Sequence, residues 1–138
     1  MSATGGKLTL TVVTPERSVV EKTPCDEVTL PAEQGEIGVL PGHTPLITLL
    51  GTGVVAYRSA GGAPGAVAVR GGFAEIAGDV VRVLADDAAG QSAIDPAAVT
   101  KQRDAAEARR LSVVGAEELD AVNAEVAFAE ARLKVARA

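Results

Sequence analysis

The chain has 138 residues, 2% aromatic residues and a net charge of −5, from 13 basic and 18 acidic side chains. This size fits one compact domain with an appendage. The acidic balance argues against binding to nucleic acid or anionic lipid, which both require a basic surface. With so few aromatic rings, we expect neither a pocket nor a nucleic-acid surface built on stacking, and the core must consist of Val, Leu, Ile and Ala.

The composition also indicates the compartment. Cys25 is the only cysteine, so no disulfide can form within the chain, which fits a reducing environment. Met1–Lys7 lacks the basic segment and apolar run of a signal peptide. No stretch approaches the roughly 18 apolar residues that a membrane span needs. We therefore expect a soluble, cytoplasmic protein without direct membrane insertion.

The first part of the chain is a series of short, strand-like runs separated by turn residues. Gly78 and Asp79 predict a tight hairpin between the last two runs. Runs that recur about every 8–12 residues without a helical segment predict an antiparallel sandwich or barrel and exclude a parallel βαβ sheet. The runs cover 8–13, 17–22, 26–30, 36–40, 46–50, 53–58, 66–70, 73–77 and 79–84.

The periodicity becomes helical after Ile94. Asp95 can cap free amide groups, and Pro96 is tolerated at the first helical position. The sequence predicts a first helix over 97–111, and Gly115 is the expected hinge or cap that follows it.

On the first helix, Arg103 and Glu107 lie one turn apart, as a stabilising ion pair requires.

A second helix is predicted over 116–135. The second helix carries a narrow apolar seam with a charged back, which predicts pairing of the two helices in an antiparallel hairpin. Because the seam residues are small, burial of the seam contributes only about a few kcal/mol, so we expect a closed resting hairpin that is able to detach and rebind elsewhere. The seam consists of Leu119, Val122, Val126, Ala129, Leu133 and Ala136.

The chain offers little for catalysis. One histidine, His43, and one cysteine, Cys25, match no zinc spacing and no nucleophile signature, and Cys25 is expected at a core or edge position. Glu33 and Glu36 are near in sequence, and we interpret them as solvated loop charges and not as an acid–base pair. We therefore predict no active site and no metal site.

Two separated segments carry a resemblance to a known family. Residues 30–55, LPAEQGEIGVLPGHTPLITLLGTGVV, and residues 69–88, VRGGFAEIAGDVVRVLADDA, closely resemble the epsilon subunit of F-type ATP synthase, bacterial type. The opening LTLTVVTPER and the helical pair also fit, so the resemblance spans residues 7–138.

The resemblance implies a β + α fold with two domains. An antiparallel β-sandwich of about ten strands, residues 1–90, would bind the gamma subunit and the c-ring, and a regulatory C-terminal helical hairpin, residues 91–138, would follow it. Such subunits are non-catalytic rotor components of the central stalk that couple ring rotation to the alpha/beta catalytic head. The hairpin can fold against the sandwich or extend along gamma into the head and inhibit ATP hydrolysis. An Ala/Gly/Val-rich chain suits a bacterium, so the implied location is peripheral, on the cytoplasmic face of the plasma membrane.

The resemblance also implies contact residues. Glycines and prolines would shape and stiffen a loop that meets the c-ring. Its predicted contact residues are Glu33, Gly35, Glu36, Gly38, Pro41, Gly42 and His43. The basic residues of the tail are interleaved with acids, so they form either a solvated helix face or a face that docks on an acidic partner. The predicted regulatory contacts are Arg103, Arg109, Arg110, Arg132 and Lys134.

One departure from the family concerns nucleotide binding. Some bacterial members bind ATP through an Ile/Leu-Asp-x-x-Arg-Ala motif at the first helix. Here Ile94 and Asp95 are present, but Ala98 stands in place of the arginine. The substitution removes a charge-assisted contact, and Arg103 or Arg109 would have to replace it. We expect ATP to bind weakly or not at all, and no other cofactor.

Two other functions remain open at this stage. A free-standing β-sandwich that binds a ligand would dimerise through its helices and would not co-purify with gamma. A small hydrolase would need His43 and Cys25 for activity.

Overall fold

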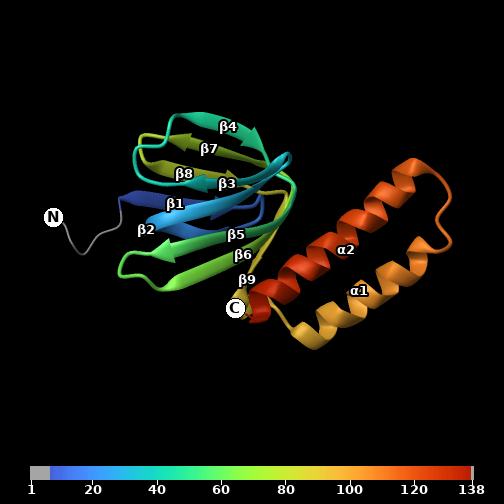
Figure 1. The fold of residues 1–138 in the computed structure, drawn as a ribbon. Coiled ribbons are helices and arrows are strands. Elements are labelled where there is room, and N and C mark those ends of the chain that lie inside the picture. The colour runs from blue at the N-terminus through green and yellow to red at the C-terminus, as the bar shows by residue number, and fades with distance from the viewer. Residues whose placement is uncertain (1–6, 138) are drawn as a thin grey trace.

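The computed structural model describes residues 7–137 and shows a β-sandwich followed by a helical hairpin (Figure 1). Residues 1–6, with most of the segment considered for a signal peptide, and residue 138 lie outside the described residues. The strands are β1 (Leu8–Val13), β2 (Ser18–Ala32), β3 (Gly35–Val39), β4 (Leu46–Leu49), β5 (Thr52–Ser59), β6 (Pro64–Arg70), β7 (Phe73–Ala77), β8 (Val80–Leu84) and β9 (Asp87–Gly90). A short 3-10 helix, η1 (Gln91–Ala93), leads to α1 (Pro96–Arg110) and α2 (Ala116–Arg137).

The strands form one continuous, strongly bent sheet. Their order is β4-β7-β8-β1-β2-β5-β6-β9, and β3 pairs with β2 beside this path. All pairs are antiparallel except β1 with β8, where Thr9–Val13 runs parallel to Val80–Leu84. This arrangement confirms the predicted fold class, with nine strands in residues 7–137 where about ten were expected.

Two strand predictions differ from the structure. The runs 17–22 and 26–30 are one strand, β2, because Thr23 and Pro24 between them still pair with β1. The positive φ of Lys22, 40°, and the register shifts against β1 bend this strand without ending it. Strand β9 was missed because its sequence, DAAG, has poor β propensity. Its antiparallel pairing with β6 holds it in the sheet.

The core of the sandwich is aliphatic, as the composition predicts. Leu8, Leu10 and Leu30 are fully buried, and Cys25 is buried with them. No polar or charged residue is buried among residues 7–137. The sandwich is therefore held by apolar packing and strand pairing.

The helix boundaries follow local capping. The Asp95 carboxylate accepts a hydrogen bond from the Ala97 amide at 3.1 Å, and Pro96 occupies the first turn. Gly115, with φ of 100°, precedes α2, and its carbonyl accepts from Leu119 N at 3.1 Å. Gly115 thus serves as the cap between the two helices.

The predicted ion pair of Arg103 and Glu107 is wrong. Arg103 pairs with its neighbour Asp104 at 3.3 Å, and Arg110 approaches Glu107 at 3.9 Å. All four side chains are partly exposed, where water screening makes alternative pairings nearly equal in energy.

Helix α2 has two apolar faces, so the prediction of one seam with a charged back is wrong. Of the predicted seam, Val122, Val126, Ala129 and Leu133 are buried, Ala136 is half-buried, and Leu119 stays 38% exposed. A second stripe packs instead against the sheet residue Ala68 and the half-buried Val54, Ala66 and Ile94. We call this contact the docking interface, and its residues on α2 are Phe128, Ala131 and Val135.

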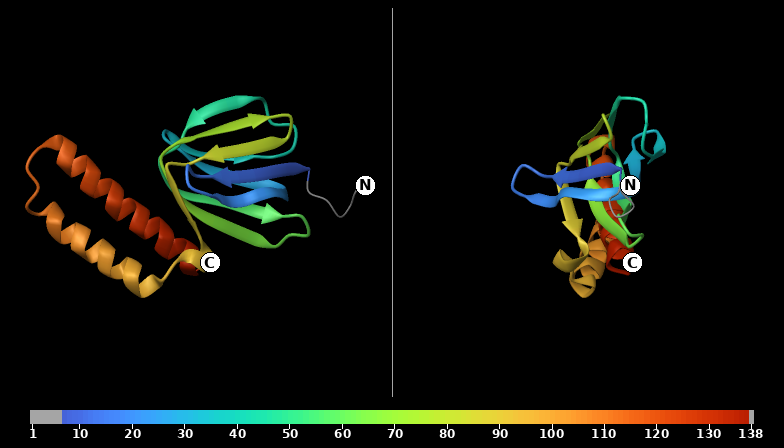
Figure 2. Two further views of the ribbon diagram at one scale, coloured as in Figure 1. Left: turned by 180° about the vertical axis from the view of Figure 1, so that it is seen from behind. Right: turned by 90° about the vertical axis from the view of Figure 1, so that its left-hand side faces the viewer.

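The hairpin lies against one end of the sandwich, and its α1–α2 loop points away from it (Figures 1 and 2). The β2–β3 turn is at this hairpin end. The β3–β4 and β7–β8 connections are at the opposite end. The β2–β3 turn can therefore share a partner with the hairpin, whereas the β3–β4 and β7–β8 connections can share a partner with each other.

A pair of glycine variants tests the sandwich packing. Gly72 and Gly61 have nearly equal positive φ values, 95° and 96°, but a Cβ on Gly72 would overlap the Leu84 carbonyl, whereas Gly61 faces open space. We expect Gly72→Ala to lower the free energy of unfolding by about 3 kcal/mol or more, and Gly61→Ala by only about 1 kcal/mol. Urea unfolding measures both. Equal losses would contradict the packing around Gly72.

Candidate partner-binding surfaces

The described chain shows no assembled catalytic group. Residues 7–137 hold no cluster of three or more His, Cys, Asp or Glu side chains able to bind a metal. The Cys25 thiol donates to the Thr23 carbonyl at 3.3 Å, and burial, reinforced by the Asp26 carboxylate, raises the pKa of Cys25 from 9.0 to about 11. A thiol with this pKa stays protonated at neutral pH and is a poor nucleophile. The His43 ring nitrogen Nδ1 lies 2.6 Å from the Thr44 carbonyl oxygen, at the loop surface.

The seven predicted ring-contact residues do not form one loop. Exposed Glu33, Gly35 and Glu36 lie at the β2–β3 turn, beside the hairpin. Pro41, Gly42 and His43 lie in the β3–β4 connection at the far end, and Gly38 lies between the two groups within β3. The backbone from Glu36 to Pro41, most of which is extended β3, separates the groups by about 15 Å at roughly 3.3 Å per residue. One small partner loop cannot contact both ends.

The β3–β4 connection is held by the β7–β8 turn. Gly42 N donates to the Asp79 carboxylate at 2.7 Å, and His43 N donates to the Leu40 carbonyl at 3.1 Å. Asp79 has a φ of 63° and Gly42 a φ of 86°, so both turns use left-handed backbone. A loop tied in this way loses little entropy when a partner binds it.

An exposed apolar surface covers β4, β7 and β8. Ile47 and Leu49 are 69% and 59% exposed, and they share one face of β4 because side chains alternate along a strand. Leu49 pairs with Phe73, which pairs with Leu84, so these side chains form a row across three strands. We call Ile47, Leu49, Phe73 and Leu84 the β4 patch. Contiguous exposed apolar side chains of this kind mark sites of protein association.

The β4 patch was not predicted from the sequence. The run LITLL is apolar at four of its five positions, and a largely apolar run is typical of a strand buried on both faces. β4 pairs with β7 alone among the strands of residues 7–137 and lies at the edge of the sheet, and nothing local in this run shows that Ile47 and Leu49 face solvent.

Two hollows flank α2 where it meets the sandwich. The larger, about 600 Å³, lies between the β2–β3 turn, the start of β5 and α2, and we call it the β3 groove. Its charged lining residues are Glu36, Arg103, Glu130, Lys134 and Arg137. The smaller, about 350 Å³, is lined by charged residues of β6, β9 and both helices, and we call it the β9 groove. These residues are Arg70, Asp87, Arg109, Glu125 and Arg132.

The candidate nucleotide residues are not brought together. Ile94 packs into the apolar clusters at the base of the hairpin, and the Asp95 carboxylate caps α1. Arg103 lines the β3 groove, whereas Arg109 lines the β9 groove on the other flank of α2. The two arginines therefore do not converge with Asp95 on one phosphate-sized position.

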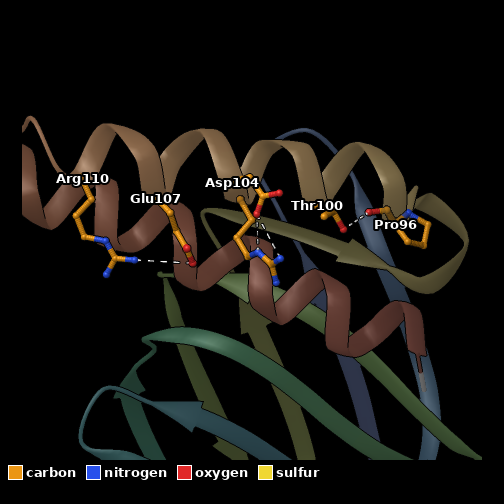
Figure 3. A network of polar contacts seen from close by, with 6 residues as sticks. Pro96, Thr100, Asp104, Glu107 and Arg110 are labelled. Atoms are coloured by element: carbon orange, nitrogen blue, oxygen red, sulfur yellow. Dashed lines mark hydrogen bonds and ion pairs between the residues drawn. The ribbon is translucent and has the colours of Figure 1, made fainter.

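The candidate regulatory residues make mostly local contacts. Arg109 joins the helices through an ion pair with Glu125 at 2.6 Å. Figure 3 shows that Arg110 contacts Glu107 and that the polar contact of Asp104 also stays within α1. Lys134 is exposed.

Arg132 lies closer to the docking interface. Its guanidinium carbon lies 4.6 Å from the centre of the Phe128 ring, a cation–π distance. Burial lowers the pKa of Arg132, opposed by the Asp87 carboxylate, which raises it. Arg132 therefore covers the ring that anchors α2 to the sheet.

The hairpin is attached to the sandwich by apolar contacts. Among residues 7–137, no ion pair joins the two parts. The Gln91 side-chain amide of η1 donates to the Ala136 carbonyl at 3.4 Å. On α2, only Phe128 and Val135 of the docking interface are larger than alanine, and each contributes about 1.5–3 kcal/mol when fully buried. The attachment on the α2 side thus depends on few side chains.

No helix within residues 7–137 has the length and apolar character that crossing a membrane requires.

Comparisons with known proteins identify relatives. Residues 7–91 match the family described as ATP synthase, delta/epsilon chain, beta-sandwich domain. The chain is 45% identical over 134 residues to the ATP synthase epsilon chain of Moorella thermoacetica, covering 95% of this chain and 97% of the relative. It is 50% identical to the ATP synthase epsilon chain of Solibacter usitatus over 88 residues, and these residues cover 64% of this chain and 64% of the relative. The fold resembles a chain in Euglena gracilis mitochondrial ATP synthase with a TM-score of 0.79 at 23% identity, covering 95% of this chain and 81% of that one.

The raised pKa of Cys25 predicts a loss of stability at alkaline pH. The unfolded thiol ionises near its ordinary pKa of 9.0 while the folded thiol ionises near 11, so the stabilisation is complete below pH 9 and disappears as the pH rises through 11. We expect a loss of about 2 kcal/mol over this range that is absent in Cys25→Ala. Urea unfolding of both proteins between pH 8 and pH 11 measures it. In Cys25→Ala, any remaining pH dependence of the unfolding free energy belongs to Tyr57, whose pKa burial also raises, and to other groups. If the unfolding free energy falls equally with pH in both proteins, Cys25 is not the source of the loss.

Proposed function

Because this chain belongs to the ATP synthase delta/epsilon family and is an epsilon-type, central-stalk subunit of F-type ATP synthase, we propose that it acts as a non-catalytic rotor element with an inhibitory hairpin. One observation carries the proposal: a tightly packed sandwich bears an exposed apolar patch, while the helices attach to it through three apolar side chains of α2. The sandwich transmits torque from the c-ring through gamma, and the hairpin regulates ATP hydrolysis.

The gamma subunit binds the β4 patch. Ile47 and Leu49 offer apolar side chains that a permanent partner would remove from water. The β3–β4 connection leads directly into β4 and contributes Leu40, which is 60% exposed, beside His43. We therefore assign the Pro41–His43 loop to the gamma contact, at the end of the sandwich away from the hairpin.

The c-ring binds the β2–β3 turn. Glu33 and Glu36 are exposed there, and Gly35, with φ of 132°, shapes the turn. The separation of this turn from His43 by the length of β3 supports two different contacts, one with the ring and one with gamma. A peripheral position on the cytoplasmic face of the bacterial plasma membrane follows from this ring contact.

The hairpin exchanges between a docked and an extended position. In the docked position, the interface at Phe128 is apolar and small. In the extended position, the helices reach the alpha/beta head along gamma, and the arginines of the hairpin contact acidic surfaces there. We expect ATP to bind weakly or not at all, and the separation of Arg103, Arg109 and Asp95 supports this expectation.

Charge insertion in the β4 patch tests the gamma contact. We expect the double variant Ile47→Asp/Leu49→Asp to weaken binding of purified gamma about 100-fold or more, since two carboxylates would have to lose water in the interface. The matched control is Leu111→Asp/Val114→Asp at the hairpin tip, where the side chains are 91% and 85% exposed. Calorimetry measures both. If the control weakens gamma binding as much as the patch variant, the assignment fails.

Hairpin variants with opposite expected signs test inhibition. Deleting residues 94–138 should raise ATP hydrolysis by the assembled enzyme, because no helix can reach the head. Phe128→Ala should lower hydrolysis several-fold, because losing about 2–3 kcal/mol of docking shifts the population to the extended state.

The control for these variants is Leu119→Ala, which lies on α2 outside the docking interface and is 38% exposed. It should leave hydrolysis within about twofold of the unmodified enzyme. Unchanged turnover after the deletion would show that the helices are structural and not regulatory.

A further inference from the structure

Glu36 lines two neighbouring hollows. The β3 groove lies between the β2–β3 turn and α2, and a second hollow of about 420 Å³ lies between the same turn and β4. The two share Ala32, Gly35 and Glu36. The surface proposed to meet the c-ring therefore continues past the β2–β3 turn onto the docked hairpin.

The two walls of the β3 groove carry different charges. The sandwich wall has Glu36, and the hairpin wall has Arg103, Lys134 and Arg137 together with Glu130. In the part of the chain that the structure describes, the side chains of Glu36, Glu130 and Lys134 make no hydrogen bond or ion pair. Arg137 donates only to the Leu133 carbonyl of its own helix, at 3.2 Å, and Arg103 pairs with its neighbour Asp104. The charges of the groove are thus available to a ligand.

We propose that the β3 groove receives a polar turn of the c-ring, so that the docked hairpin forms one wall of the ring contact. This inference rests on the proposed ring contact at Glu36. The turn that fits has a carboxylate, which faces Lys134 and Arg137, and a cationic or amide donor, which faces Glu36. The volume of about 600 Å³ falls within the range of roughly 300–1,000 Å³ typical of ligand pockets, so the groove has room for side chains of a partner turn.

Binding of the ring and docking of the hairpin are then linked. A partner that touches both walls binds the docked state more tightly than the extended state, so it stabilises docking. The linkage is reciprocal, because the factor by which the ring favours docking equals the factor by which docking favours the ring. A ring that engages the subunit fully would thereby restrain the inhibitory movement of the hairpin.

Charge-reversal variants of the full-length chain test this proposal against the purified c-ring in detergent. Lys134→Glu/Arg137→Glu should lower the affinity for the ring about tenfold at low salt, and Glu36→Gln should also lower it. The matched control is Lys101→Glu/Arg110→Glu, two exposed positions of the hairpin that line neither hollow. It should change the affinity less than about twofold. Circular dichroism checks that the helices of each variant remain folded.

The outcomes separate this inference from the proposed function. If Glu36→Gln weakens ring binding while Lys134→Glu/Arg137→Glu behaves like the control, the hairpin is not part of the contact and the inference is overturned, although the ring contact stands. If Glu36→Gln has no effect, the proposed ring contact itself fails, and the inference with it.

A second measurement tests the linkage directly. Adding the purified ring to the full-length chain should slow amide hydrogen exchange in residues 127–137 of α2, because these amides open when the hairpin leaves the sandwich. In Phe128→Ala, which loses the main docking side chain, the affinity for the ring should also fall. Unchanged exchange in α2 at saturating ring would overturn the linkage.

Discussion

The packing of the C-terminal half of α2 on two sides determines how the parts of this subunit are arranged. Val126 and Leu133 face the hairpin partner, and Phe128 and Val135 face the sheet. The helix can form this double contact only because its small residues, Ala129 and Ala131, allow close approach on both faces. Without the contact to the sheet, the hairpin would have no fixed position relative to the sandwich, and neither groove beside α2 would exist. A few apolar side chains therefore set the position of the hairpin on the sandwich.

The two parts of the chain differ in how strongly they are held. The sandwich has a continuous core that runs from β1 through β8, with side chains such as Leu8, Leu30 and Ile76 fully buried. It is suited to transmit torque because close-packed interiors deform little. The hairpin is attached through a much smaller apolar contact. The sandwich is thus the more strongly held part of the chain, and the hairpin is the part held by the smaller contact.

Much of the fold was predictable, because strand and helix periods and the Asp95-Pro96 cap are local signals. The errors arose where tertiary contacts decide. Pairing with β1 makes β2 one strand, and pairing with β6 holds β9 in the sheet despite its composition. The second apolar face of α2 was not predicted, because Ala131 and Val135 lie next to the seam in the sequence and do not form a separate apolar pattern. For the candidate site, adjacency in sequence suggested one loop from Glu33 to His43. The extended backbone of β3 separates them, and that separation depends on the strand pairing of β3 with β2.

The absence of ion pairs between the hairpin and the sandwich within residues 7–137 has a physical consequence. Apolar docking depends little on ionic strength, whereas contacts made by exposed charges such as Lys134 weaken as salt is added. Because α2 docks with its apolar stripe, the basic residues on its flank stay available to other subunits. A hairpin docked through these charges would have to break its own ion pairs before it met a partner, and each partner would compete with docking. By separating the two kinds of contact, α2 can stay on the sandwich and present charge to a partner at once.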